Sequence, residues 1–505
     1  MTEVRSACPA GSAALDVEAL HDLLASSFEV SRGKARVVRR TALDTFDRRL
    51  ERAGQRLQLV ADAGEERLEL VQSGETLVSV LADTGLRWPA MARALPEGTL
   101  KDHVARLAGI RALLVVDERR RLVHRAELRN ADRKIVVRLD VDEPAGGAAP
   151  PPVVTVRPLR GYQKEADRAW RLVTTLLEPA TNEPVAPRAA SPSVADPELA
   201  ARALLAAELT DFLQEVRDNL PGTIGDVDTE FLHDVRVAVR RTRSLLKLGR
   251  PALPAHFREA WEPQFKWLGD LTTPVRDLDV YQLGLPEMAG WLVAASAADL
   301  EPFQAHLARR RAADRRVLLR ALRGARLRRL LDDWTGELSA LADSARSADG
   351  AAWSAGALAR TNVARAHRRV VHGGTSISDS SAPEDLHVLR KRCKELRYAL
   401  EMFAPVLDDA QVGKAIKDLK SLQDVLGRFQ DSEVQRTTLH GFAQEMVADG
   451  APAEALLAMG ELMGHLYAEQ QRARAEFATA FASYVRPASH RRMLRLLGSG
   501  GKAAG

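Results

Sequence analysis

The chain has 505 residues, more than a single hydrophobic core supports, so we expect at least two domains. With 46% hydrophobic and 28% charged residues, its composition is that of a folded globular protein and excludes a disordered or fibrous one. The net charge is only +5, from 73 basic and 68 acidic residues, so any site for a polyanion must be a local patch.

Cysteine usage and hydropathy bear on the compartment. Cys8 and Cys393 are the only cysteines, too few for a disulfide framework, which favours a reducing compartment. No segment reaches the roughly 20 consecutive apolar residues that cross a bilayer. Residues 1–15 lack the basic start and apolar run of a signal peptide. We therefore predict a cytoplasmic protein.

Residues 1–178 predict an α+β domain that is rich in antiparallel strands. The period-two alternation of half-buried strands occurs at 56–59, 67–71 and 134–141. Helical patterns occur near 17–26, 100–107 and 163–177. A Pro/Gly/Ala tract at 144–152 interrupts the strand-like sequence and predicts a loop between two strands.

A linker and an all-helical domain are predicted to follow. Residues 179–197 contain five prolines and no periodicity, which indicates a linker. Amphipathic helical patterns without strand signals fill residues 198–490. This length favours two four-helix bundles, with halves at about 198–345 and 352–490, and a flexible tail at 491–505. The predicted helix breakers are Pro221-Gly222, Pro251 to Pro254, Asp349-Gly350 and Gly373-Gly374.

The segment that begins at His233 predicts a helix with a basic stripe. At about 100° per residue, the side chains at i+3, i+7, i+10 and i+14 fall within an arc of roughly 80°. In this sequence they are Arg236, Arg240, Arg243 and Lys247. Apolar residues occupy the opposite face, so we expect the helix to bury that side and to turn the stripe outward.

The same phase recurs from His387. Its side chains at i+3, i+7 and i+10 are Arg390, Lys394 and Arg397. The two segments align at an offset of 154 residues, which indicates an internal duplication. Downstream, Gly269 and Gly427 are each followed by aspartates, and a glycine before an aspartate favours the end of one helix and the start of the next.

A single basic stripe is most often the solvated face of a surface helix. Two stripes with matching residue types and phase favour binding instead, because a helix that only needs solubility mixes charge signs at i,i+4. Guanidinium and ammonium groups spaced by helical turns of about 5.4 Å offer serial donors to phosphate oxygens. We predict a linear chain of phosphates as the ligand.

Two motifs of this sequence resemble the signature helices of the CHAD family, the conserved histidine α-helical domain. They are His233-x-x-Arg236-Val237-x-x-Arg240-Arg241-x-Arg243-Ser244 and His387-x-x-Arg390-Lys391-x-x-Lys394-x-x-Arg397-Tyr398-x-x-Glu401. The resemblance covers about residues 198–490. It implies two pseudo-symmetric four-helix bundles whose signature helices line a basic cavity, binding of inorganic polyphosphate, and association with polyphosphate granules.

The resemblance also implies a set of ligand contacts. They are His233, Arg236, Arg240, Arg243, His387, Arg390, Lys394 and Arg397, with Arg241, Lys247 and Lys391 at the rim. Outside the motifs, a further set either extends the patch or belongs to solvated surface: Arg365, Arg368, Arg369, Lys417 and Lys420. No catalytic residue, metal or cofactor is predicted for these helices.

The first 178 residues resemble a divergent CYTH domain, of the triphosphate tunnel group. The resemblance is carried by Asp44-Thr45-Phe46-Asp47-Arg48-Arg49-Leu50 and Ala53-Gly54-Gln55-Arg56-Leu57. The group's Glu-x-Glu-x-Lys strand, which holds the catalytic divalent metal, is absent from the sequence, and Gln58 and Val60 stand where two tunnel arginines are expected. We therefore predict that this domain is not a triphosphatase.

Two alternatives to polyphosphate binding stay open on the sequence. One is an inorganic triphosphatase that acts through the N-terminal domain. The other is nucleic-acid binding, although aromatic residues are only 5% of the chain and none interrupts the His233 stripe. Asp277 and Asp279 fit metal ligation or, better, a helix cap or an ion pair with Arg276. Motifs for nucleotide, serine-hydrolase or zinc chemistry are absent from the sequence.

Overall fold

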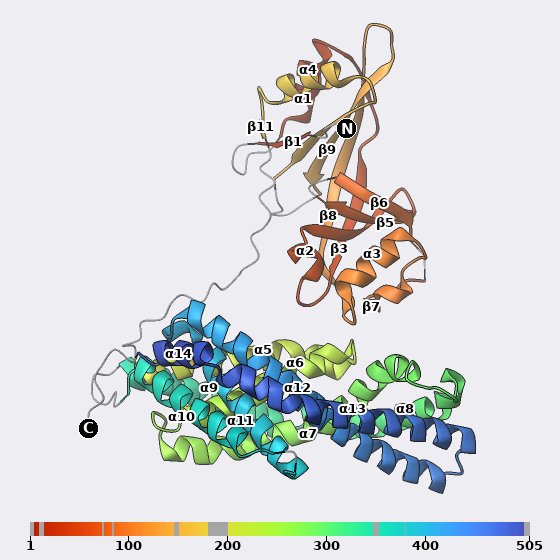
Figure 1. The fold of residues 1–505 in the computed structure, drawn as a ribbon. Coiled ribbons are helices and arrows are strands. Elements are labelled where there is room, and N and C mark those ends of the chain that lie inside the picture. Colours follow the sequence, from red (N-terminus) through yellow and green to blue (C-terminus); the bar gives the residue numbers. More distant parts are fainter. Residues whose placement is uncertain are drawn as a thin grey trace. The chain divides into compact units, whose positions relative to one another are not determined.

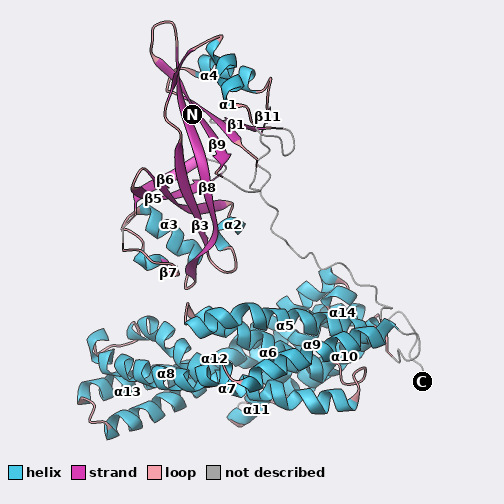
Figure 2. Ribbon diagram, turned by 180° about the vertical axis from the view of Figure 1, so that it is seen from behind, coloured by secondary structure: helices cyan, strands magenta, loops and turns pink. Residues whose placement is uncertain are grey.

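A computed structural model describes residues 5–9, 15–72, 75–82, 85–145, 151–179, 200–346, 353–378 and 380–498. The chain divides into two compact units, residues 1–189 and 190–505 (Figure 1). The strands, drawn in magenta, all belong to the first unit, and the second is helical wherever the structure describes regular elements (Figure 2). The α+β domain followed by an all-α domain is thus confirmed.

The first unit is built on one antiparallel sheet. Its strand order is β11-β1-β10-β9-β8-β3-β4-β5-β6, and β2 and β7 pair with β8. The strands are β1 (Arg5–Cys8), β2 (Glu29–Arg32), β3 (Arg36–Asp44), β4 (Gln55–Asp62), β5 (Glu65–Gln72), β6 (Glu75–Leu81), β7 (Ala90–Met91), β8 (Ala112–Arg129), β9 (Ile135–Pro144), β10 (Val153–Pro158) and β11 (Glu178–Pro179). The three predicted strand segments lie in β4, β5 and β9.

Four helices cover the apolar face of this sheet. They are α1 (Val17–Ala25), α2 (Arg49–Arg52), α3 (Thr99–Ala108) and α4 (Gln163–Val173). One apolar cluster joins α1 and α4 to β1, β8, β9 and β10, and another joins α2 and α3 to β3, β4 and β5. Alternation along each strand directs the remaining side chains to the other face, which is rich in charges.

The helical unit repeats a series of helices. The first half contains α5 (Ala201–Gly225), α6 (Thr229–Leu248), α7 (Ala255–Ala289), α8 (Glu301–Leu322) and α9 (Ala325–Arg346). The second contains α10 (Ala355–Thr375), α11 (Pro383–Met402), α12 (Asp409–Ala448), α13 (Ala453–Val485) and α14 (Pro487–Leu496). In both halves a helix of 20 residues, α6 or α11, precedes a much longer one, α7 or α12.

The hydrophobic cores do not divide along the boundary between the halves. The larger core takes residues from every helix from α5 to α14. The smaller core joins the far ends of α7 and α12 to α8 and α13. Both cores therefore tie the repeats together. None of the helices that the structure describes is long and apolar enough to span a bilayer.

Two of the predicted breaks fall inside helices. Pro221-Gly222 lies within α5 and Gly373-Gly374 within α10. Gly222 and Gly374 have no room for a side chain, because a Cβ there would overlap the rings of Phe231 and Phe481. These glycines permit close packing and do not end helices. The break at Pro251 to Pro254 is correct, since it separates α6 from α7.

Residues 491–496 are not a tail: they complete α14, whose Met493 and Leu496 are buried in the larger core. Residues 499–505 lie outside the described part of the chain, as do the predicted break at Asp349-Gly350 and all of the predicted linker except Pro179.

Candidate functional site

Helices α6 and α11 present their stripes because each has one strongly apolar side. In α6, the Asp228 side chain caps the first turn by accepting from the backbone N–H groups of Glu230 and Phe231 at 2.9 and 3.2 Å. Its buried side consists of Phe231, Leu232, Val235, Ala238, Val239, Thr242, Leu245 and Leu246. In α11 the buried side consists of Leu386, Leu389, Cys393, Leu396, Ala399, Leu400 and Met402.

The two stripes meet where α6 packs against α11. The Arg240 guanidinium lies over the Tyr398 ring, 6.0 Å from its centre. Lys247 forms an ion pair with Glu395 of α11, and the same carboxylate accepts from Arg369 of α10 at 2.7 Å. The junction therefore combines basic groups from three helices.

The centre of this junction holds cations without carboxylate partners. Burial lowers the pKa of the Lys394 ammonium, and the positive charges of Arg390 and Arg240 lower it further, whereas Asp431 raises it. Within the described residues, neither Arg240 nor Lys394 forms an ion pair. Arg243 and Lys391 are exposed and also form none there. The junction therefore holds several cationic groups close together whose N–H donors are not used by carboxylates.

The first-half end of the site surrounds His233. Arg236 donates to the Gly269 carbonyl at 3.3 Å and to the hydroxyls of Thr272 and Thr273 at 3.2 and 2.7 Å. Burial lowers the pKa of His233, and the charge of Arg276 on α7 lowers it further. Burial raises the pKa of Asp277, against the charges of Arg236 and Arg276. The nearby Asp279 pairs instead with Arg311 of α8 at 2.5 Å.

The second-half end repeats this arrangement around His387. His387 Nδ1 hydrogen-bonds Gln430 Oε1, and Arg390 pairs with Asp431 at 2.7 Å. Gln430 stands 154 positions after Arg276, and Asp431 stands 154 after Asp277. The offset of the histidine helices therefore continues through α7 and α12.

This register corrects the predicted roles of Gly269 and Gly427, which lie in the interiors of α7 and α12 and are not at equivalent positions. Gly269 lets the arginines of α6 approach, because a Cβ there would lie 3.2 Å from Arg243 Nη1. The predicted cap or ion pair at Arg276, Asp277 and Asp279 is wrong as well: Arg276 donates to the Thr229 carbonyl at 3.1 Å and to Glu230 at 3.3 Å.

Some predicted contacts have other partners. Arg241 points away from the stripe, toward α5, where it pairs with Glu215 at 3.8 Å and lies 5.9 Å from the centre of the Phe212 ring. Its predicted place at the rim stays a prediction. Arg397 pairs with Glu401 one turn later, at 2.6 Å. Of the outer set, Arg365, Arg368, Lys417 and Lys420 are exposed, and the described structure gives them no ion pair.

Residues 207–440 match the family model described as the CHAD domain. This part of the chain is a CHAD domain. The match includes α6, α11, α7 and the part of α12 that carries Gln430 and Asp431, so the site lies wholly within it.

Two relatives and three solved structures resemble parts of the chain. An uncharacterized protein of Mycobacterium tuberculosis (strain ATCC 25618 / H37Rv) is 30% identical over 236 residues, 46% of this chain and 43% of the relative. Another, from strain CDC 1551 / Oshkosh, is 29% identical over the same shares. The chain spans less than half the length of either relative.

The similar structures have TM-scores below 0.5. The CHAD domain from the plant Ricinus communis has a TM-score of 0.47 and 26% identity, covering 57% of this chain and 93% of that one. PptA from Streptomyces chartreusis has a TM-score of 0.42 and 18% identity, covering 56% and 98%. A putative adenylate cyclase from Bacillus halodurans has a TM-score of 0.27 and 15% identity, covering 36% and 95%.

Sequence reasoning missed two residues of the CHAD domain that shape the site. Arg276 acts on His233 from α7, and Glu395 accepts from both Lys247 and Arg369. Arg276 could have been found by extending the 154-residue offset, since that pairs it with Gln430. Glu395 gave no such signal, because its contacts depend on how α6, α10 and α11 pack.

The charged face of the N-terminal sheet is largely neutralised from within. Asp142 pairs with Arg40 and Arg121. Asp62 pairs with Arg125 at 3.2 Å and Arg36 at 4.0 Å, and Asp140 pairs with Arg157 at 3.2 Å and Arg125 at 3.6 Å. No group of three or more His, Cys, Asp or Glu side chains that could hold a metal occurs among the described residues.

Proposed function

We propose that the CHAD domain binds inorganic polyphosphate, or a similar linear polyanion, along the junction of α6 and α11. The observation that carries this proposal is the pair Arg240 and Lys394. They are equivalent residues of the two stripes, the charge of Arg240 acts on Lys394, and neither forms an ion pair with a residue that the structure describes. Holding two cations together costs electrostatic energy that a bound anion recovers.

The types of side chain around this pair suit a ligand that is a chain of phosphates. Arginine offers a bidentate fork to phosphate oxygens and lysine a compact point charge, and each stripe contains both residue types. Arg243 and Lys391 add two further basic groups on α6 and α11, and both are exposed. A ligand of repeated phosphates can contact these groups one after another. Such binding would hold the protein at polyphosphate granules in the cytoplasm.

The test is a titration of the full chain with polyphosphate of defined length. Affinity should rise with chain length and fall steeply with salt, because each neutralised phosphate releases counterions. The double variant Arg240→Glu with Lys394→Glu should lose binding by at least about a hundredfold, since two attractions become repulsions.

The matched control reverses two exposed arginines of α8, Arg309→Glu with Arg320→Glu, which changes the net charge by the same amount. Unchanged affinity in the Arg240/Lys394 variant would show that these residues are not the binding site. Equal losses in both variants would show that only the net charge of the protein matters. Displacement of polyphosphate by equal charge concentrations of DNA or RNA would favour a nucleic-acid binder.

We propose further that the N-terminal domain has no triphosphatase activity. Asp62, Asp140 and Asp142 already engage five arginines of the charged face, so these carboxylates are occupied as partners of cations. By strand alternation, Gln58 and Val60 share that face of β4 with Asp62. Gln58 donates to Glu69 at 3.0 Å.

A further inference from the structure

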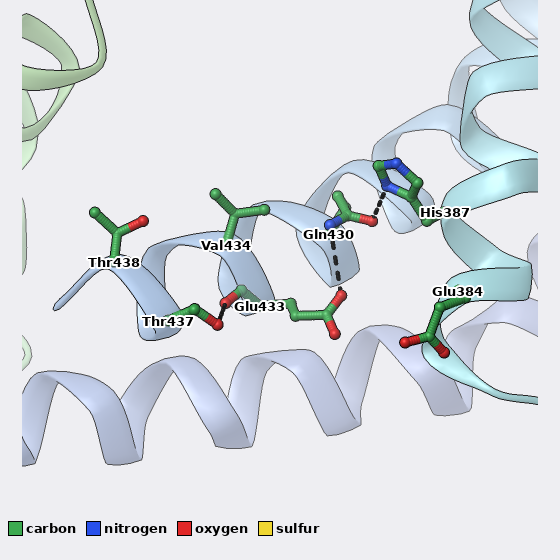
Figure 3. Close-up of a pocket in the computed structure, with 7 residues that line it drawn as sticks. All are labelled: Glu384, His387, Gln430, Glu433, Val434, Thr437 and Thr438. Carbon is green, nitrogen blue, oxygen red and sulfur yellow. Dashed lines mark hydrogen bonds between the residues drawn. The ribbon is translucent and has the colours of Figure 1, made fainter. Parts of the chain in front are cut away.

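A hollow of about 370 Å³ lies between the first turn of α11 and the middle of α12. Figure 3 shows the residues that line it: Glu384, His387, Gln430, Glu433, Val434, Thr437 and Thr438. Two carboxylates, a histidine and two hydroxyls thus share one small concave space with a single aliphatic side chain.

The polar groups in the hollow have a defined direction of hydrogen bonding. Gln430 Oε1 can only accept, so His387 Nδ1 donates to it. The amide nitrogen of Gln430 then donates to Glu433 Oε2 at 3.4 Å (Figure 3). Neither Glu384 nor Glu433 forms an ion pair with any residue that the structure describes. The hollow therefore has spare acceptors and no cation.

The first half of the domain shows what occupies the equivalent place. At the offset of 154, Glu384 corresponds to Glu230, Gln430 to Arg276, and Glu433 to Asp279. In the first half, the Arg276 guanidinium donates to Glu230 at 3.3 Å, and Asp279 is neutralised by Arg311 at 2.5 Å. In the first repeat these two carboxylates contact two guanidinium groups. The equivalent carboxylates of the second repeat contact none among the described residues.

We infer that this hollow binds an organic cation, a guanidinium or primary ammonium group on a short aliphatic chain. The cationic group takes the place that Arg276 fills in the first half, between Glu384 and Glu433. The hydroxyl oxygens of Thr437 and Thr438 accept hydrogen bonds from its remaining N–H groups. Val434 contacts the aliphatic part. A bare metal ion fits less well, since no group of three metal-ligating side chains is formed among the described residues.

The experiment is calorimetric titration of the full chain with agmatine, which carries a guanidinium and an ammonium group on a four-carbon chain. Saturable 1:1 binding is expected. Glu433→Gln and Glu384→Gln should each weaken it by roughly tenfold, the effect of one charge-assisted hydrogen bond. Glu337→Gln, which removes an exposed carboxylate of α9, is the matched control and should bind like the wild type.

The decisive variant is Gln430→Arg, which supplies from within the guanidinium that the first half already has. It should abolish agmatine binding while the helical circular dichroism signal is retained. Absence of wild-type binding, full binding by Gln430→Arg, or saturation by Mg²⁺ in place of agmatine would each overturn the inference. The inference does not depend on polyphosphate binding, so the two proposals fail separately.

Discussion

At the scale of single residues, the histidines of the helical domain sit in unlike surroundings. His233 and His387 belong to the two stripes on α6 and α11, whereas His367 lies on α10 and contacts a core residue of α13. Its Nδ1 lies 2.7 Å from the Tyr484 hydroxyl of α13, and the ring of His490 on α14 lies 6.3 Å away, centre to centre. Burial and the charge of His490 lower the pKa of His367 to about 4. His367 is therefore neutral in the folded protein near neutral pH.

This makes His367 a source of acid sensitivity. A histidine whose folded pKa lies below its ordinary 6.5 takes up protons more readily when unfolded, so stability falls as pH drops from 6.5 toward 4. Between pH 7 and pH 5 the loss should be about 2 kcal/mol.

The change His367→Gln keeps a hydrogen-bonding group toward Tyr484 and removes the titration. Urea unfolding followed by helical circular dichroism at the two pH values should show the smaller loss in the variant. Equal losses would mean that other groups set the acid sensitivity.

At the scale of elements, the sequence predicted which faces of α6 and α11 are basic, because helical periodicity is a local property. It did not predict that the charge of Arg240 would act on Lys394, nor that Glu395 and Asp431 would pair with members of the stripes. Those contacts join residues about 40 to 150 positions apart, and they depend on packing between helices.

The predicted helix breaks failed for a related reason. Glycine and proline lower intrinsic helix propensity, but tertiary contacts can outweigh that cost. Gly222 and Gly374 lie in helices at positions where the rings of Phe231 and Phe481 occupy the space that a side chain would need. Only glycine allows this packing. The local sequence pattern predicts a helix end at such a glycine, whereas in the folded domain the glycine lets an aromatic ring pack against the helix backbone.

Glycine substitutions distinguish these two roles. Gly374→Ala should destabilise the helical domain by about 1–3 kcal/mol, since the added methyl displaces Phe481. Gly413→Ala, on α12, meets nothing within 4 Å and should stabilise it by up to about 1 kcal/mol through helix propensity. Thermal unfolding measures both. A Gly374→Ala protein as stable as the wild type would show that Phe481 has room to move.

At the scale of the whole molecule, the two units differ in how their charges are used. The sheet of the first unit pairs its arginines with its own aspartates, whereas the CHAD domain leaves Arg240 and Lys394 without carboxylates among the described residues. The proposed polyanion binding therefore belongs to the second unit.

Because the aspartates of the first unit already pair with arginines, we predict that this unit does not hydrolyse triphosphate. The full chain should release no phosphate from tripolyphosphate in the presence of Mg²⁺ or Mn²⁺, as measured by a phosphate assay. Sustained turnover that is lost in Asp142→Asn would prove the N-terminal domain to be a working triphosphatase.

The closeness of Arg240 to Lys394 has a consequence for how a ligand enters. The two residues are equivalent in the two repeats. Equivalent residues that lie close together must lie near the pseudo-twofold axis that relates the repeats. In both directions from that axis the stripes offer the same set of a histidine and two arginines: His233, Arg236 and Arg243 on α6, and His387, Arg390 and Arg397 on α11. A nucleic-acid strand has unlike 5′ and 3′ ends, but a polyphosphate chain reads identically from either end. We therefore expect polyphosphate to thread the site with either end leading.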